Sequence, residues 1–211
     1  MSLGDTNKHI INTANKGVMI DIGANHGMYT TQMAKKATKV YAFEPHPDNL
    51  KKLEEACKGC DNIIINPTAL SNKRGTCRLF LSKNNPGGHS ISVRVADVGK
   101  WTHTIDNYIE VPTITLDDYC IEHDVTGITA IKVDVEGAEE YVLAGMYQTL
   151  RNNKLVMSLE THQTIDCQEV ADILKRCGYK IWSKRRDCLV DIVEYDSQYY
   201  VTNRPEVLPE S

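Results

Sequence analysis

An acidic residue and two glycines meet at one turn of this chain, and residues of these types at this spacing can bind a nucleotide cofactor. Asp21 lies in an apolar run at residues 18–22, Gly23 and Gly27 follow it, and residues 27–37 have the pattern of a helix. Glycine lets the backbone approach a ligand closely, and the free N–H groups at a helix start can bind its polar groups. The turn therefore predicts a cofactor site where a strand passes into a helix.

The spacing of the glycines indicates which cofactor fits. NAD-binding turns have the pattern G-x-G-x-x-G, whereas Gly23 and Gly27 form G-x-x-x-G, with Ala24 and Asn25 directly after the first glycine. The carboxylate of Asp21 would repel a pyrophosphate and attract a cation. S-adenosylmethionine carries an ammonium, a sulfonium and an adenosine, so these residues favour it as the cofactor. An NAD-dependent oxidoreductase stays open as the alternative.

A second acidic residue follows the next predicted strand. Residues 39–43 have an alternating pattern, and Glu44 and Pro45 come directly after them. At the carboxyl edge of a parallel sheet, such an acid can accept two hydrogen bonds from ribose hydroxyls. Glu44 could also be an acid at a helix start, and NAD proteins share this spacing. We also expect the following residues to contact the cofactor: Ala24, Asn25, Tyr29, Pro45 and Ala69.

A third predicted strand, residues 129–134, ends in two further acids. Asp134 closes the strand and Glu136 follows it, before a predicted helix. In a doubly wound sheet the ligand crevice lies where the strand order reverses. If the first strand and this one flank that point, Asp134 faces Asp21 across the pocket and binds the cofactor. Either acid could instead cap the helix and complement its dipole. For Glu139, inside the predicted helix, we expect a solvent-facing position.

Together these motifs resemble the FkbM-type methyltransferases, which belong to the class I S-adenosylmethionine-dependent group. The similar segments occur in order from about residue 17 to about residue 182: 18–27, 43–47, 115–118, 131–139 and 159–162. The resemblance implies O-methylation of a hydroxyl on a sugar or secondary metabolite, so the expected partner is a small hydroxylated acceptor. It also implies that the cofactor site is lined by Asp21, Gly23, Gly27, Glu44 and Asp134.

A hydroxyl is a weak nucleophile, so methylation of an acceptor oxygen calls for a general base. Four candidates follow the predicted strands: Asp134, Glu136, Glu160 and His162. His162 is our first candidate because the ordinary pKa of histidine lies close to neutral pH. Asp134 could instead hold the amine of the cofactor. His89, in a glycine-containing loop, is a further candidate.

The elements that position these residues alternate between strand and helix. Strands are expected at 18–22, 39–43, 62–66, 129–134, 154–159, 178–182 and either 188–194 or 198–202, and helices at 27–37, 47–58, 136–149 and 166–177. This order predicts a Rossmann-like, doubly wound α/β fold. We expect a mostly parallel seven-stranded sheet with helices on both faces and an antiparallel C-terminal hairpin. We expect one domain over 1–211, with an N-terminal extension at 1–16 and a tail at 203–211.

One region, residues 67–128, is too long for a single crossover helix. It contains two additional predicted strands at 76–81 and 108–114, separated by a loop rich in glycine and asparagine at 84–90. Such an insertion at the carboxyl edge of the sheet could frame the acceptor pocket, or it could be a plain surface hairpin. Thr115 and Asp118 have the spacing of a helix N-cap.

Composition narrows the possible partners and location. The net charge is −4, from 24 basic and 28 acidic residues, so we expect no nucleic-acid partner. No apolar run is long enough to span a bilayer, and no signal peptide core is present, which predicts a cytoplasmic protein with no membrane partner. The seven cysteines are scattered and odd in number, which suits reduced thiols.

No metal site is expected from the spacing of the ligand-type residues. Cys57 and Cys60 form a single C-x-x-C pair with no second pair, so we assign them a structural role. The histidines show no H-E-x-x-H pattern. Two further alternatives stay open: an N-methyltransferase acting on nucleic acid or protein, and a non-catalytic module that binds the cofactor. The acidic balance and the Thr68 after Pro67, where such N-methyltransferases tend to carry a second proline, disfavour the former.

Overall fold

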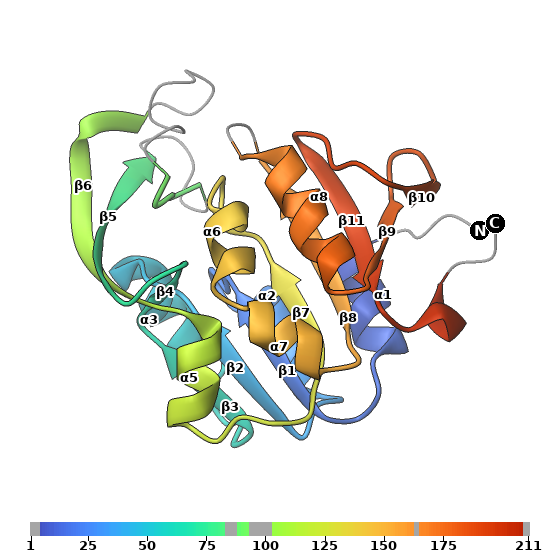
Figure 1. The fold of residues 1–211 in the computed structure, drawn as a ribbon. Helices are drawn as coiled ribbons and strands as arrows, with labels where there is room; N and C mark the ends of the chain where they lie inside the picture. Colours follow the sequence, from blue (N-terminus) through green and yellow to red (C-terminus); the bar gives the residue numbers. More distant parts are fainter. Residues whose placement is uncertain (1–4, 83–87, 93–102, 163–164, 209–211) are drawn as a thin grey trace.

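A large twisted sheet forms the centre of the protein and carries the candidate residues at its carboxyl edge (Figure 1). The structure, a computed structural model, describes residues 5–82, 88–92, 103–162 and 165–208. In these residues the sheet has eight strands in the order β10-β9-β11-β8-β7-β1-β2-β3. Their bounds are β1 Val18–Ile22, β2 Lys39–Phe43, β3 Ile63–Asn66, β7 Ile128–Val133, β8 Val156–Thr161, β9 Lys180–Ser183, β10 Cys188–Val190 and β11 Ser197–Thr202.

The predicted doubly wound architecture is confirmed, with one difference in the strand count. β3, β2, β1, β7 and β8 pair in parallel. Both C-terminal candidates are strands, so the sheet has eight described strands where we expected seven. They do not pair with each other: β10 pairs with β9, and β11 lies antiparallel between β9 and β8. The order reverses between β1 and β7, which is where a ligand crevice is expected.

Helices cover both faces of the sheet (Figure 1). Their bounds are α1 Thr6–Thr13, α2 Met28–Ala34, α3 Pro47–Ala56, α5 Leu116–Glu122, α6 Glu139–Ala144, α7 Tyr147–Asn152 and α8 Cys167–Arg176. Side chains alternate along a strand, so Ile20 and Ile22 pack with the core under α6, α7 and α8, whereas Met19 packs with the core under α1 and α2. Asp21 therefore points to the face covered by α2.

The expected N-terminal extension contains a helix that completes the core. Asp5 caps α1 by accepting hydrogen bonds from the backbone N–H of Asn7 (3.0 Å) and Lys8 (3.2 Å). Ile10 and Ile11 are buried against the sheet. The sequence pattern did not predict this helix, because two buried isoleucines in eight residues make a weak periodic signal.

The insertion forms a second, three-stranded sheet of order β4-β6-β5. β4 (Ala69–Leu70) lies parallel to β6 (His103–Ile114), and β5 (Gly75–Ser82) lies antiparallel to β6. The predicted strands at 76–81 and 108–114 are confirmed, and both are longer than expected. The segments 83–87 and 93–102, which include most of the predicted loop, lie outside the described residues.

A break in the predicted helix 136–149 holds the insertion against the main sheet. The helix is divided into α6 and α7 at Gly145, whose carbonyl accepts a hydrogen bond from the N–H of Asp117 (3.0 Å). The Asp117 carboxylate accepts hydrogen bonds from the N–H groups of Gln148 (2.8 Å) and Thr149 (2.7 Å) at the start of α7. Thr115 caps α5 as predicted, by accepting from the N–H of Asp118 (2.9 Å).

Cys57 and Cys60 form no disulfide, and all seven cysteines are free thiols. Cys57 is buried beside Leu53 and Ala24 under α3. Burial raises the pKa of the Cys57 thiol to about 11, so this thiol stays protonated at neutral pH and is unreactive. These properties agree with a structural role.

Gly145 offers a direct test of how the insertion is docked. A Cβ atom at this position would lie 2.0 Å from the carbonyl oxygen of Ser71, at the end of β4. We expect Gly145→Ala to lower the free energy of unfolding by about 1–3 kcal/mol, measured by urea denaturation, because the backbone must shift to accept the methyl group. Ala144→Gly, at the exposed neighbouring position, should lower it by at most about 1 kcal/mol. Equal effects of the two changes would contradict this close packing.

Candidate active site

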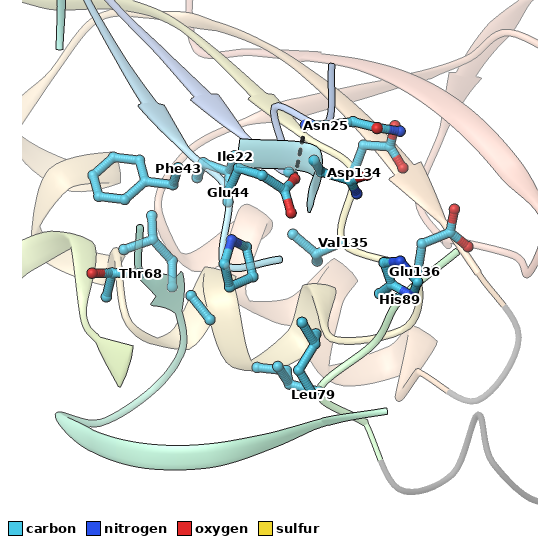
Figure 2. Close-up of a pocket in the computed structure, with 16 residues that line it drawn as sticks. Ile22, Asn25, Phe43, Glu44, Thr68, Leu79, His89, Asp134, Val135 and Glu136 are labelled. Atoms are coloured by element: carbon cyan, nitrogen blue, oxygen red, sulfur yellow. Dashed lines mark hydrogen bonds between the residues drawn. The ribbon is translucent and has the colours of Figure 1, made fainter. Parts of the chain in front are cut away.

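A pocket lies at the carboxyl ends of β1, β2 and β7, between the main sheet and the insertion (Figure 2). Its cavity volume is about 240 Å³, slightly below the roughly 300–1,000 Å³ typical of small-molecule sites. Seven of the predicted site residues line it: Gly23, Asn25, Glu44, Pro45, Ala69, Asp134 and Glu136. The other predicted residues lie outside its lining: Asp21, Ala24, Gly27, Tyr29, Glu160 and His162.

Glu44 is the best-oriented carboxylate in the pocket. One of its oxygens accepts a hydrogen bond from the N–H of Asn25 (2.8 Å), and the other accepts from the N–H of His46 (2.9 Å), as Figure 2 shows for Asn25. Burial raises the pKa of Glu44, and these two hydrogen bonds partly oppose that shift. The Asn49 side chain also forms a hydrogen bond with Glu44. A carboxylate has about four acceptor sites, so Glu44 can still accept a hydrogen bond from a ligand hydroxyl.

The two glycines of the first turn allow other segments of the protein to pack closely against the turn. Gly23 has a φ of +77°, and a Cβ atom there would lie 1.8 Å from the carbonyl oxygen of Asp134. Gly27 has a φ of +82° at the N-cap of α2, and a Cβ atom there would lie 2.8 Å from a methyl group of Leu53. The close approach that we expected toward a ligand is, at Gly23, an approach to the loop after β7.

Asp21 faces away from the pocket. It is fully buried, and its Oδ2 accepts a hydrogen bond from the hydroxyl of Thr30 on α2 (2.6 Å). Its Oδ1 lies 3.4 Å from the ammonium nitrogen of Lys132. We predicted that Asp21 and Asp134 face each other across the pocket, and this geometry is wrong because Lys132 lies between them. Asp21 acts on the site through this lysine.

Lys132 is the residue that joins the two acids, and sequence reasoning missed it. Its Nζ donates a hydrogen bond to the carbonyl of Gly23 (3.0 Å) and lies 3.4 Å from Asp134 Oδ2. Burial alone would lower the pKa of Lys132, but the charges of Asp134 and Asp21 hold it above its ordinary value. A lysine between Ile131 and Val133 in an apolar strand must be buried and therefore paired, a signal that was present in the sequence.

The catalytic candidates form one cluster beside the cofactor pocket. His162 Nε2 lies 3.4 Å from Glu136 Oε2 and 3.8 Å from Asp134 Oδ1. His162 Nδ1 lies 2.7 Å from Oε1 of Glu139, which is fully buried. We interpreted Glu139 as a solvent-facing helix residue, which is wrong. Glu136 and Gly137 have positive φ values (56° and 96°), and this turn directs the Glu136 carboxylate toward His162.

The protonation states of this cluster favour Glu136 over His162 as the general base. Burial alone would lower the pKa of His162, but its bond to Glu139 and the charges of Glu139, Glu136 and Asp134 raise it to about 10. His162 is therefore an imidazolium at neutral pH and has no lone pair for a proton. Burial raises the pKa of Glu136 to about 7, partly opposed by His162. Glu136 is the group that can exchange a proton near neutral pH.

The remaining candidates border the cluster. Glu160 on β8 accepts a hydrogen bond from the side-chain amide of Gln198 (2.9 Å), and burial raises its pKa. Tyr29 on α2 donates a hydrogen bond to Asp5 (3.3 Å), and its ring centre lies 6.0 Å from the Lys132 ammonium. Neither side chain reaches the pocket wall.

The insertion supplies the opposite wall of the pocket. Thr68, Ala69, Leu70, Leu79, His89 and Ile91 all line it. The ring of His89 stacks on that of His46, with centroids 4.0 Å apart. His89 Nδ1 accepts a hydrogen bond from the N–H of Ser82 (3.1 Å). The insertion therefore frames the pocket and is more than a surface hairpin.

The Lys132 network predicts a specific pattern of stability changes. Lys132→Met should lower the free energy of unfolding by about 3–5 kcal/mol, because it leaves the buried carboxylate of Asp21 without a cation. Adding Asp21→Asn should restore part of the lost free energy of unfolding, because the second change removes the buried, unpaired carboxylate. Urea denaturation of the two single variants and the double variant measures the coupling. Strictly additive effects, or a loss under about 1 kcal/mol for Lys132→Met, would contradict the network.

Comparison with known proteins gives the chain its family. A model of the FkbM methyltransferase domain matches residues 21–181. The hexuronic acid methyltransferase AglP of Haloferax volcanii is 29% identical over 157 residues, which cover 74% of this chain and 61% of that protein. The 2-O-methyltransferase NoeI of Sinorhizobium fredii is 28% identical over 160 residues, which cover 70% and 65%. The match thus spans less than two thirds of the length of either relative.

The fold agrees with this assignment. A crystal structure of the methyltransferase FkbM from Methylobacillus flagellatus matches with a TM-score of 0.55 at 15% identity, over 90% of this chain and 45% of that chain. The FkbM methyltransferase domain model matches the sequence over more than half of the chain. The chain therefore belongs to the FkbM methyltransferase family.

Proposed function

We propose that this protein is an S-adenosylmethionine-dependent methyltransferase that methylates a hydroxyl on a small acceptor, a sugar. The observation that carries the proposal is the placement of Glu44, an oriented carboxylate in the pocket at the switch point of the sheet. Family membership and the named activities of AglP and NoeI support it.

The residues of the pocket fit the cofactor. Glu44 offers two acceptor oxygens that match the adjacent hydroxyls of a ribose. Asp134, on the pocket wall, offers a carboxylate for a cationic group. Ile22, Phe43, Leu70 and Leu79 give an apolar surface against which an adenine ring can pack. The pocket therefore combines a diol acceptor, a negative charge and an apolar slot.

The chain's own groups then have to position an acceptor and take up a proton. When bound, S-adenosylmethionine supplies a methyl group already activated by its sulfonium. The protein must hold the acceptor oxygen in line with that group, and such positioning can contribute about 7–11 kcal/mol. Glu136 borders both the pocket and the His162 cluster. With a pKa near 7, it can accept the proton of the acceptor hydroxyl.

A sugar acceptor is supported by the relatives, and the charge of the chain disfavours a nucleic acid. AglP is named for hexuronic acid and NoeI for 2-O-methylation. The net charge of −4 gives no basic field for a phosphate backbone. Within the described ranges, no helix has the length and apolar character needed to cross a bilayer. A cytoplasmic location stays a proposal, supported by the odd number and scattered positions of the seven cysteines.

Cofactor binding can be tested directly. The unmodified protein should bind S-adenosylmethionine and S-adenosylhomocysteine in calorimetric titrations, and Glu44→Gln should weaken both by about 10–100-fold, because hydrogen bonds to a charged group contribute about 1.5–3 kcal/mol. Glu54→Gln, at an exposed position on α3, serves as the matched control and should change neither affinity. Binding of NAD in preference to both ligands would favour the oxidoreductase alternative instead.

The proposed role of Glu136 in proton transfer can also be tested. Glu136→Gln should lower kcat for methylation of a sugar hydroxyl by about 10²–10⁴-fold, because the variant loses its proton acceptor. Its affinity for S-adenosylhomocysteine should change less than threefold, because the ribose contact at Glu44 is intact. Radiolabelled methyl transfer to a panel of sugars and uronic acids provides the rate. A variant with unchanged kcat would remove Glu136 from the mechanism, and no transfer by the unmodified protein would favour a binding module.

A further inference from the structure

Three potential metal ligands from two different strand ends converge beside the pocket. Asp134 and Glu136 lie in the loop after β7, and His162 follows β8. One ligand atom from each lies within 4.8 Å of the other two. The two carboxylate oxygens lie 3.4 Å and 3.8 Å from His162 Nε2. Metal–oxygen bonds of about 2.1 Å place neighbouring ligand atoms roughly 3 Å apart, so small side-chain rotations bring all three onto one ion.

His162 is held as metal-ligating histidines are held. Its Nδ1 lies 2.7 Å from Glu139 Oε1, so the other ring nitrogen faces Asp134 and Glu136. A carboxylate on the far nitrogen orients an imidazole and makes it a better ligand. Glu139 is completely buried, and its Oε2 has no hydrogen-bond partner in the described part of the chain. Its Oε1 also accepts a hydrogen bond from the N–H of Gly137 (3.2 Å), which fixes the carboxylate against His162.

The cluster also carries an excess of negative charge. Three carboxylates lie around the His162 ring: Glu139 at 2.7 Å, Glu136 at 3.4 Å and Asp134 at 3.8 Å. Lys132 is the cation that contacts Asp134, and it is shared with Asp21. Several carboxylates in a partly buried site favour the binding of a cation.

We propose that Asp134, Glu136 and His162 hold a divalent metal ion on the acceptor side of the pocket, with Glu139 as the positioning residue for His162. Binding of the ion releases the proton of His162 Nε2 to solvent, and the neutral imidazole then donates its Nδ1–H to Glu139. Two carboxylates and one imidazole suit a first-row ion that accepts both oxygen and nitrogen ligands, for which Mn²⁺ is the best representative. Three protein ligands leave positions open for water or for oxygens of the acceptor.

The ion would deepen the proposed function by giving the acceptor hydroxyl a second partner. A bound cation lowers the pKa of an oxygen ligand and stabilises its negative charge. The proton released from the hydroxyl passes to a carboxylate of the cluster or to water. The role in turnover rests on the proposed methyl transfer, whereas the binding of the ion does not. Sequence spacing did not predict this site because His162 lies far along the chain from the two acids.

Metal binding can be measured without cofactor or acceptor. Titration of the metal-free protein with Mn²⁺ at pH 8, followed by electron paramagnetic resonance of the free ion, should show one ion bound per chain. Asp134→Asn, Glu136→Gln and His162→Gln should each weaken binding at least tenfold, and Glu139→Gln by about 10–100-fold. Glu54→Gln, at an exposed position on α3 outside the ligand set, should change affinity less than threefold. Circular dichroism checks that each variant is folded.

A second measurement uses the unmodified protein alone. Substoichiometric Mn²⁺ should broaden the imidazole NMR signals of His162 and leave those of the exposed His123, which follows α5, sharp. Absence of binding, or binding that persists in all three ligand variants, would overturn the proposed site. Binding of S-adenosylhomocysteine is measured separately by calorimetry. A protein that binds no metal ion can therefore still be shown to bind the cofactor product. Turnover that is insensitive to EDTA would overturn the catalytic role of the ion and leave Glu136 acting alone.

Discussion

The architecture of the site depends on one buried ammonium group. Lys132 on β7 is almost completely buried and contacts the carbonyl of Gly23, Asp21 on β1 and Asp134 at the end of its own strand. Removing a charge from water is unfavourable by several kcal/mol unless partners surround it. The two strands at the switch point must therefore stay in register at this edge. Thr30 extends the same network to α2 through Asp21.

Asp134 divides the site into two halves with different chemistry. One of its oxygens faces Lys132, and the other faces His162. On the side of β2, Glu44 is held by two backbone N–H groups and faces the pocket as an acceptor for a ligand hydroxyl. On the side of β8, Glu136 and His162 have pKa values of about 7 and about 10, and Glu139 holds the imidazole. A cofactor in the first half would meet an acceptor at the second, with the insertion closing the pocket opposite.

Much of this arrangement was predictable from the sequence, for identifiable reasons. Apolar runs that end in acids mark the carboxyl edges of strands, which located Gly23, Glu44, Asp134 and Glu136 on the pocket. We predicted the direction of the Asp21 side chain wrongly. The position of Asp21 near the end of an apolar run indicates where the strand ends, but not which face of the sheet the side chain points to. The alternation of Ile20, Asp21 and Ile22 contained that information, since both isoleucines pack under α6–α8.

Other features could not be derived from local patterns. Glu139 was interpreted as a solvent-facing residue, and only the return of the chain at His162 shows that it is buried. The division of the helix at Gly145 follows from the approach of β4, which is distant in sequence. The charge of His162 results from three carboxylates on two other segments, so its ordinary pKa was a poor guide to its role. Each of these depends on tertiary contacts between segments far apart in the chain.

A crystal structure of the protein with S-adenosylhomocysteine would show whether this pocket is the cofactor site. We expect the ribose hydroxyls to donate hydrogen bonds to Glu44, and the sulfur to face the side of the pocket where Asp134, Glu136 and His162 meet. The adenosine should lie against the apolar wall formed by the insertion and β2. An adenosine bound elsewhere, or a ribose with no contact to Glu44, would contradict the account.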